Sequence, residues 1–152
     1  MLAEIKIDGL SELIKNFERA PIETYNNIKV AINQSAIEIS EAIKKETPVG
    51  KKNGGTLKSG IFPEFSELTA VIRPHNAPYA GWVHNGTKPY DIHPVKKQAL
   101  YWDGAPHPCK VVHHPGIKAN PFMERGLNII LPKVEKIFND AISKILSILS
   151  KK

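Results

Sequence analysis

The stretch that decides the fold is PIETYNNIKVAINQSAIEISEAIKKETP, residues 21–48. Apolar or small side chains recur in it every three or four positions, which is the spacing of one face of an α-helix. The members of this stripe are Tyr25, Ile28, Ile32, Ser35, Ala36, Ile39, Ala42 and Ile43. Pro21 suits the first turn of a helix, and the residue before Pro48 is driven out of the α region. The stretch therefore predicts one long helix that ends at Thr47 and has one buried face.

The chain before this helix predicts a short strand and a short helix. Ile5 and Ile7 alternate with polar residues and are followed by an Asp-Gly turn at residues 8–9, as at the end of a strand. Ser11 is a candidate N-cap for a helix that should stop before Pro21. The apolar residues at helical spacing are Leu10, Leu13, Ile14 and Phe17.

The chain after the long helix predicts a small sheet. Residues 61–73, IFPEFSELTAVIR, contain two apolar runs with a polar break at Ser66 and Glu67, a pattern that predicts a hairpin with a wet outer face. Further along, residues 90–94, 99–103 and 110–115 are rich in β-branched and aromatic side chains but lie among prolines. We interpret these three pieces as short strands or irregular extended segments.

Helical spacing returns in residues 121–148. Its apolar members are Met123, Leu127, Ile130, Leu131, Val134, Ile137, Phe138, Ala141, Ile145 and Ile148. Pro132 interrupts the pattern, so that either the helix kinks there or a short turn precedes a main helix whose first turn contains Pro132. Both alternatives stay open at this point.

The order helix, sheet, helix predicts an α+β fold, with a long N-terminal helix and a C-terminal helix packed on a small, mainly antiparallel sheet. A length of 152 residues fits a single domain, residues 1–152, that folds without disulfides. Residues 48–60 hold four of the ten glycines and the lysines Lys51, Lys52 and Lys58, with no acid. By composition this segment is a flexible basic loop.

The net charge of +6 comes from 18 lysines, 3 arginines and 15 acidic residues. Such a balance favours unspecific attraction to polyanions, whereas the scarcity of arginine argues against reading of base edges. Cys109 is the lone cysteine and is compatible with a reducing compartment. The acidic N-terminus is unlike a signal peptide, and no window predicts a membrane span, so we expect a soluble protein.

Aromatic and histidine residues gather in GWVHNGTKPYDIHPVKKQALYW, residues 81–102, which contains both tryptophans. This composition would suit an active site, but the chain has no Gly-x-Ser-x-Gly, no phosphate-binding glycine loop and no paired carboxylates beside a histidine. We therefore expect no enzyme activity and no cofactor. Instead, Tyr79, Trp82 and Val83 can pack on the sheet as a short turn, while Gly86 lets the chain reverse where a Cβ would clash.

A metal site is the weaker alternative for the histidines. His107, Cys109, His113 and His114 fall within eight residues, and the spacing from Cys109 to His113 resembles that of zinc ligand pairs. However, no second well-spaced pair completes a tetrahedral set, and prolines restrict the neighbouring backbone. We expect surface histidines and no bound metal.

The apolar stripes of two long helices exceed what a small sheet can cover. Burial in the monomer's own core is the common fate of such stripes, but self-association into a closed ring would cover the remaining edges. A basic amphipathic helix lying on a membrane is the rival interpretation of ISKILSILSKK, residues 142–152, although this stretch lacks an aromatic anchor.

Five blocks of the sequence, taken in order, resemble the phage tail-component family named for gene product ten of phage Hong Kong 97. The blocks are IDGLSELIKNFERAP, KKETPVG, GGTLKSGI, PYAGWVHNGT and HHPGIKANPFMERGL. In this order they span roughly residues 5–131, nearly the whole chain. Two departures stand out: His84 takes the place of an acid usual in the fourth block, and the basic loop is lengthened by KKNGG before Thr56.

The resemblance implies a virion structural protein of the head-tail connector or tail-completion class, located in the neck or tail of the virion and in the host cytoplasm during assembly. Its partners would be copies of itself, in a ring that forms on assembly, and neighbouring neck or tail proteins. A monomeric isolated chain is compatible with this role. Lys51, Lys52 and Lys58 would contact a partner ring or line the DNA channel, where unspecific attraction suffices. The alternative is a small basic nucleic-acid-binding or metal-binding module. No membrane partner is expected.

Overall fold

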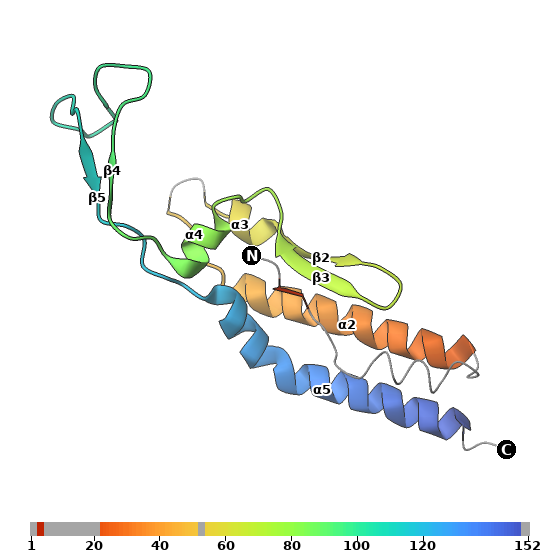
Figure 1. The fold of residues 1–152 in the computed structure, drawn as a ribbon. Helices are drawn as coiled ribbons and strands as arrows, with labels where there is room; N and C mark the ends of the chain where they lie inside the picture. Colours follow the sequence, from red (N-terminus) through yellow and green to blue (C-terminus); the bar gives the residue numbers. More distant parts are fainter. Residues whose placement is uncertain (1–2, 5–21, 52–53, 150–152) are drawn as a thin grey trace. The chain divides into compact units, whose positions relative to one another are not determined.

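A computed structural model describes residues 3–4, 22–51 and 54–149 (Figure 1). The chain divides into two compact units. The first consists of residues 1–80 and 122–152, and the second of residues 81–121. The strand expected at residues 5–7 and the short helix expected at residues 11–20 lie outside the described residues. The single domain expected from the length stays a prediction, and each unit is described separately.

The long helix predicted from residues 21–48 is α2, Ile22–Glu46. It ends as expected, because Pro48 follows directly and Thr47 turns its side chain back to donate a hydrogen bond from Oγ1 to the carbonyl of Ile43, at 2.7 Å. This bond satisfies one of the carbonyls that a helix end leaves without an intrahelical donor. Ile39 and Ile43 are among the most deeply buried side chains of the protein.

The sheet of the first unit has the strand order β1-β3-β2 and is antiparallel throughout. The strands are β1 (Ala3–Glu4), β2 (Ile61–Phe65) and β3 (Ala70–Pro74). β2 and β3 form the predicted hairpin, with Phe65 opposite Ala70. Its inner face buries Ile61 and Ile72, and its outer face carries an ion pair between Arg73 and Glu64 at 2.7 Å. The α+β fold predicted from the sequence is confirmed.

Pro63 lies in β2, and its backbone nitrogen faces away from β3. The backbone bonds from His75 N to Gly60 O and from Ser66 N to Thr69 O, together with the register, point the even-numbered residues of β2 at β3. Odd-numbered residues therefore present their backbone to the opposite edge, where Pro63 has no N–H to offer. A proline at this place discourages another strand from extending the sheet.

The C-terminal helix is α5, Phe122–Leu149, and it continues through Pro132. The interpretation in which a short turn precedes a main helix is therefore wrong. Proline lacks one backbone donor and is tolerated here on the exposed side of the helix. α5 runs beside α2 (Figure 1), and two ion pairs join the helices: Arg125 to Glu46 at 3.0 Å and Lys133 to Glu38 at 2.6 Å.

Gly126 marks the closest approach of the two helices. A Cβ built on this glycine would lie 2.6 Å from the Cα of Ile43 and 2.8 Å from its backbone nitrogen. Backbone atoms cannot move aside without moving the whole helix. Gly126 is thus required by the packing of α5 on α2, and the fully buried Phe122 and the buried Met123 anchor the same end of α5.

Some apolar residues of both helices face outward. Tyr25 was expected in the buried stripe of α2, but it is exposed, and the neighbouring Thr24 is buried instead. The Nζ of Lys29 lies 5.8 Å from the Tyr25 ring centre, a favourable position for a cation on the helix surface. Leu131, expected in the buried stripe of α5, is also exposed. Within the described ranges, no helix is both long and apolar enough to span a bilayer.

Candidate functional site in a hairpin arm

The second unit is built around a long β-hairpin, which we call the arm and define as residues 87–117. Its strands are β4, Tyr90–Ile92, and β5, Val112–His114. An isolated bridge between Thr87 and Ile117 continues the same antiparallel register toward the chain ends. A second bridge joins Leu100 to Cys109, farther from the chain ends of the arm. Between this bridge and the Ile92–Val112 pair, the first side of the hairpin has five more residues than the second. Two of the three extended segments expected here are thus β4 and β5, and Leu100 of the middle segment forms a bridge.

The root of the arm depends on two glycines in left-handed conformations. Gly86 has φ +74°, and a Cβ there would lie 2.5 Å from the carbonyl oxygen of Ile117. Gly116 has φ +85°, and a Cβ there would lie 2.3 Å from the carbonyl oxygen of Thr87. A side chain at either position would be strained by the backbone and blocked by the opposite strand. The expected role of Gly86 in reversing the chain is therefore confirmed.

Hydrogen bonds close this root. Thr87 and Ile117 exchange backbone bonds of 2.8 and 3.2 Å, and the Ile117 N–H also lies 3.0 Å from Oγ1 of Thr87. The N–H of Asn120 donates to the carbonyls of Val83 and His84 at 3.1 and 3.0 Å. The sequence segments 83–87 and 116–120 are therefore brought together at one place, where they hold both ends of the arm.

Two of the histidines lie in strand β5. His113 lies opposite Asp91 and its Nδ1 contacts the Asp91 carboxylate. His114 lies opposite Tyr90 and stacks on its ring at a centroid distance of 4.8 Å. The Nδ1 of His114 also accepts a 3.0 Å hydrogen bond from the N–H of Gly116. Cross-strand pairs of this kind stabilise a hairpin, so these histidines, unexplained by the sequence, have a structural role.

The metal-binding alternative is not supported by the geometry. His113 and His114 are consecutive in β5, so their side chains point to opposite faces. Cys109 lies in the bridge to Leu100, with its thiol 3.4 Å from the carbonyl oxygen of His107. No group of three or more histidine, cysteine, aspartate or glutamate side chains could hold a metal ion in the described part of the chain.

The outer part of the arm carries an apolar hollow of about 360 Å³. Its lining residues are Ile92, Leu100, Tyr101, Trp102 and Val112. The exposed fraction is 69% for Tyr101 and 48% for Trp102, and the nearby Val95 is 94% exposed. Exposed aromatic side chains around a concave apolar surface are typical of a protein-protein contact. We therefore define these five lining residues as the candidate site.

The arm is also basic. It contains Lys88, Lys96, Lys97 and Lys110 against Asp91 and Asp103, with no arginine or glutamate. Asp91 is engaged by His113. None of the four lysines makes an ion pair within residues 3–4, 22–51 and 54–149. A partner surface with acidic groups would complement this charge.

The three residues expected to pack on the sheet, Tyr79, Trp82 and Val83, are only partly buried. Trp82 and Val83 lie in a helix, α4 (Ala80–Asn85), where a turn was expected. Trp82 is 64% exposed and Tyr79 is 38% exposed, so the packing expected for Trp82 is wrong. His84, which takes the place of the acid usual in the resembling family, is buried.

The basic loop is more regular than its composition suggests. Gly50 and Gly54 touch, since a Cβ on Gly54 would lie 2.1 Å from the Gly50 carbonyl oxygen. Residues Thr56–Ser59 form helix α3, anchored by the buried Leu57. Lys51 and Lys58 are exposed, whereas Lys52 lies outside the described residues. The flexibility expected of residues 48–60 stays a prediction.

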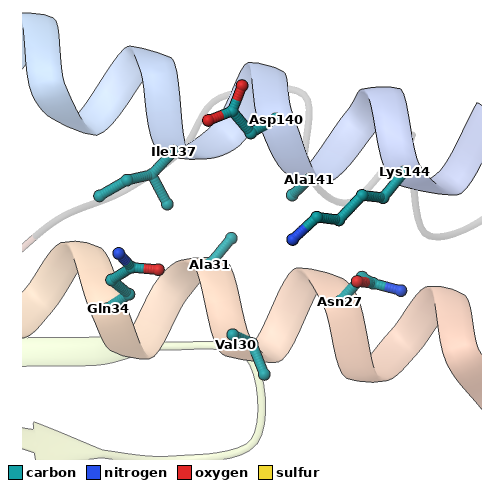
Figure 2. Close-up of a pocket in the computed structure, with 8 residues that line it drawn as sticks. All are labelled: Asn27, Val30, Ala31, Gln34, Ile137, Asp140, Ala141 and Lys144. Carbon is teal, nitrogen blue, oxygen red and sulfur yellow. The ribbon is translucent and has the colours of Figure 1, made fainter.

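A second hollow, of about 250 Å³, lies between α2 and α5. Figure 2 shows its eight lining residues, with Ala31 and Ala141 between the helices and the polar groups of Asn27, Gln34, Asp140 and Lys144 around them. None of the lining residues is a serine, cysteine or histidine. The ionisable groups among the lining side chains are the carboxylate of Asp140 and the amine of Lys144.

Comparison with known proteins gives no match: no protein-family model, no curated protein and no solved structure is significantly similar to the chain.

The sequence did not identify the candidate site, although it drew attention to the right region. Tyr101 and Trp102 lie within the quoted aromatic stretch, but Val112 lies ten residues beyond it. The signal that could have united them is the pairing of TKPYDI, which directly follows Gly86, with VVHHPGI, which contains Gly116 near its end. Such a pairing is hard to detect because the extra residues between the two bridges break the register.

Proposed function

We propose that the protein is a virion structural protein of a tailed phage or prophage. It acts in head-tail joining or tail completion, by assembling as a ring and docking to neighbouring neck or tail rings. In this role the protein works by binding other proteins and catalyses no reaction. Its location is the head-tail junction or tail of the virion, and the host cytoplasm during assembly.

The observation that carries this proposal is the arm. It exposes the candidate site at its outer end and is held at its root by Gly86 and Gly116. An isolated two-stranded hairpin has too little core to be stable alone, and is stabilised by packing against something else. A basic hairpin with an apolar hollow fits an assembly protein, for which burying surface between subunits is the function itself.

The resemblance described above adds a second, independent support. The two blocks PYAGWVHNGT and HHPGIKANPFMERGL contain the root residues Gly86, Thr87, Gly116 and Ile117. Their glycines have a physical reason at this root, because only a residue without a Cβ fits there. Two of the five blocks that carry the resemblance are thus those that hold the arm in place.

The direct experiment is deletion of the gene from the phage or prophage that encodes the chain. We expect filled heads and separate tails to accumulate, because the joint between them is missing. Electron microscopy of lysates and plaque counts measure this outcome, and the wild-type gene supplied in trans should restore infectious particles. Normal particles in the absence of the gene would exclude the proposed role.

A separate prediction concerns the basic loop. Replacing Lys51, Lys52 and Lys58 by serine should lower the yield of infectious particles while leaving the fold intact, because these lysines provide unspecific attraction to a partner ring or to DNA. Circular dichroism and plaque counts provide the two measurements. The matched control replaces Lys29, Lys45 and Lys136, which lie on the helices, and changes the net charge equally. Equal effects of the two triple variants would contradict a specific role for the lysines of the basic loop.

A further inference from the structure

The outer face of α5 is a second exposed apolar surface. Leu131, Ile142 and Leu146 are all exposed, the last by 57%. At about 100° per residue, their positions fall within about 60° of one another around the helix axis. They form one exposed stripe along α5, beside the row of the buried Ala141 and Ile145. We call this stripe, together with the exposed Glu124 and Glu135 that share its direction, the outer face of α5.

The charge of this outer face is negative. Neither Glu124 nor Glu135 makes an ion pair in the described part of the chain. The basic residues of α5 point elsewhere: Arg125 and Lys133 bridge to α2 through Glu46 and Glu38. The outer face therefore combines apolar side chains with two carboxylates and no cation.

The arm and the outer face of α5 are complementary in charge and shape. The arm combines a concave apolar hollow with four lysines in its sequence, and the outer face of α5 combines a convex apolar stripe with two glutamates. An amphipathic helix received by an apolar groove is a recurring mode of protein recognition. Each surface provides what the other lacks, and both belong to the same sequence.

We infer that the candidate site of the arm binds the outer face of α5 of a second copy of this chain. This inference specifies how the self-assembly in the proposed function takes place. It rests on the proposed function only for the claim that the assembly closes into a ring. Because the two surfaces are different, the contact is head-to-tail, and each copy keeps one free arm and one free outer face. A head-to-tail contact continues until it closes into a ring or forms a fibre, whereas a contact between identical surfaces would stop at a dimer.

The lone cysteine allows a direct test. Cys109 lies opposite Leu100, which lines the hollow. Isotope-labelled wild-type chain is mixed with an unlabelled Cys109→Ser, Ile142→Cys chain, and a short bismaleimide is added. Any link between the two sulfurs then joins different molecules, and mass spectrometry of the peptides identifies it. The matched control carries Lys136→Cys, which is also exposed on α5 but lies about 120° away around the helix.

We expect at least about tenfold more product with Ile142→Cys than with Lys136→Cys, because docking raises the effective concentration of the two sulfurs. Adding Glu124→Lys and Glu135→Lys to the unlabelled chain should lower the yield by a similar factor. Equal yields at positions 142 and 136, or no product at either, would overturn the inference. So would a link within one molecule when Ile142→Cys is made in the chain that keeps Cys109.

The cross-linking test needs no phage, so its failure can be distinguished from failure of the proposed function. Cross-linked chains without a defect in the gene deletion would leave the docking contact intact and exclude the phage role. A clear deletion defect without the cross-link would leave the phage role intact and exclude this contact.

Discussion

Replacement of Gly126 by alanine should destabilise the helix pair by about 2 kcal/mol or more. The new Cβ would meet the Cα of Ile43 at 2.6 Å, so that α5 must move away from α2 and loosen the packing along both helices. The intrinsic gain from replacing glycine by alanine inside a helix, about 1 kcal/mol, is too small to offset this. Thermal unfolding followed by circular dichroism should show a Tm lower by roughly 4–8 °C.

The matched control for this change is Gly81→Ala. Gly81 also lies in a helix, α4, but a Cβ there meets nothing within 4 Å. Its replacement should therefore leave the stability unchanged or raise it by up to about 1 kcal/mol. The same chemical change thus has opposite expected signs at two positions. A Gly126→Ala protein as stable as the wild type would show that the helices are not in close contact at this point.

Replacement of Tyr101 and Trp102 by serine should abolish self-association while leaving the fold intact. Exposed aromatic side chains at the centre of an interface commonly contribute 2 kcal/mol or more each, about thirtyfold in affinity. Because both side chains are largely exposed in the chain, their loss should change the unfolding temperature little. Sedimentation velocity measures the association and thermal unfolding measures the fold.

Tyr25→Ser provides the control for this double variant, since Tyr25 is an exposed aromatic on α2, outside the arm. It removes one exposed aromatic side chain without altering the candidate site. The control should associate as the wild type does. Loss of association in both proteins would indicate a general effect of surface hydrophobicity, and would contradict a specific role for the arm.

The sequence predicted the two long helices and the β2–β3 hairpin well because their signals are local. The long helix was bounded by Pro21 and Pro48, and its observed bounds, Ile22–Glu46, agree. The hairpin at residues 61–73 was recognisable from two apolar runs separated by a polar break, and β2 and β3 confirm it. In these segments the residues that are close in sequence are also those that form the helix or hairpin, so a short stretch is enough to predict it.

The orientation of single side chains was less predictable. Tyr25 fits the apolar spacing of α2, but Thr24 is buried in its place. Periodicity locates a stripe to within about one position, and which of two adjacent residues faces inward depends on what packs against the helix. Trp82 was assigned to the scaffold for its apolar bulk, and its exposure shows that bulk alone does not decide burial.

The candidate site was beyond reach for a different reason. Its members lie on both sides of the arm's tip, and they meet only because Thr87 pairs with Ile117 and Ile92 with Val112. The sequence shows the glycines Gly86 and Gly116, but it does not show that each lies against the opposite strand of the arm. Long-range pairing of this kind has no short sequence pattern, so the sequence predicted the elements and missed the surface they build.

The most direct test of the proposed role is the number of copies of this chain in purified particles. Mass spectrometry should find the wild-type chain in every preparation of infectious phage, at a constant ratio to the major tail protein. The Tyr101→Ser, Trp102→Ser variant, expressed at the same level in the deletion strain, should be at least about tenfold depleted from particles. Equal incorporation of the variant and the wild-type chain, or absence of both from infectious particles, would contradict the account.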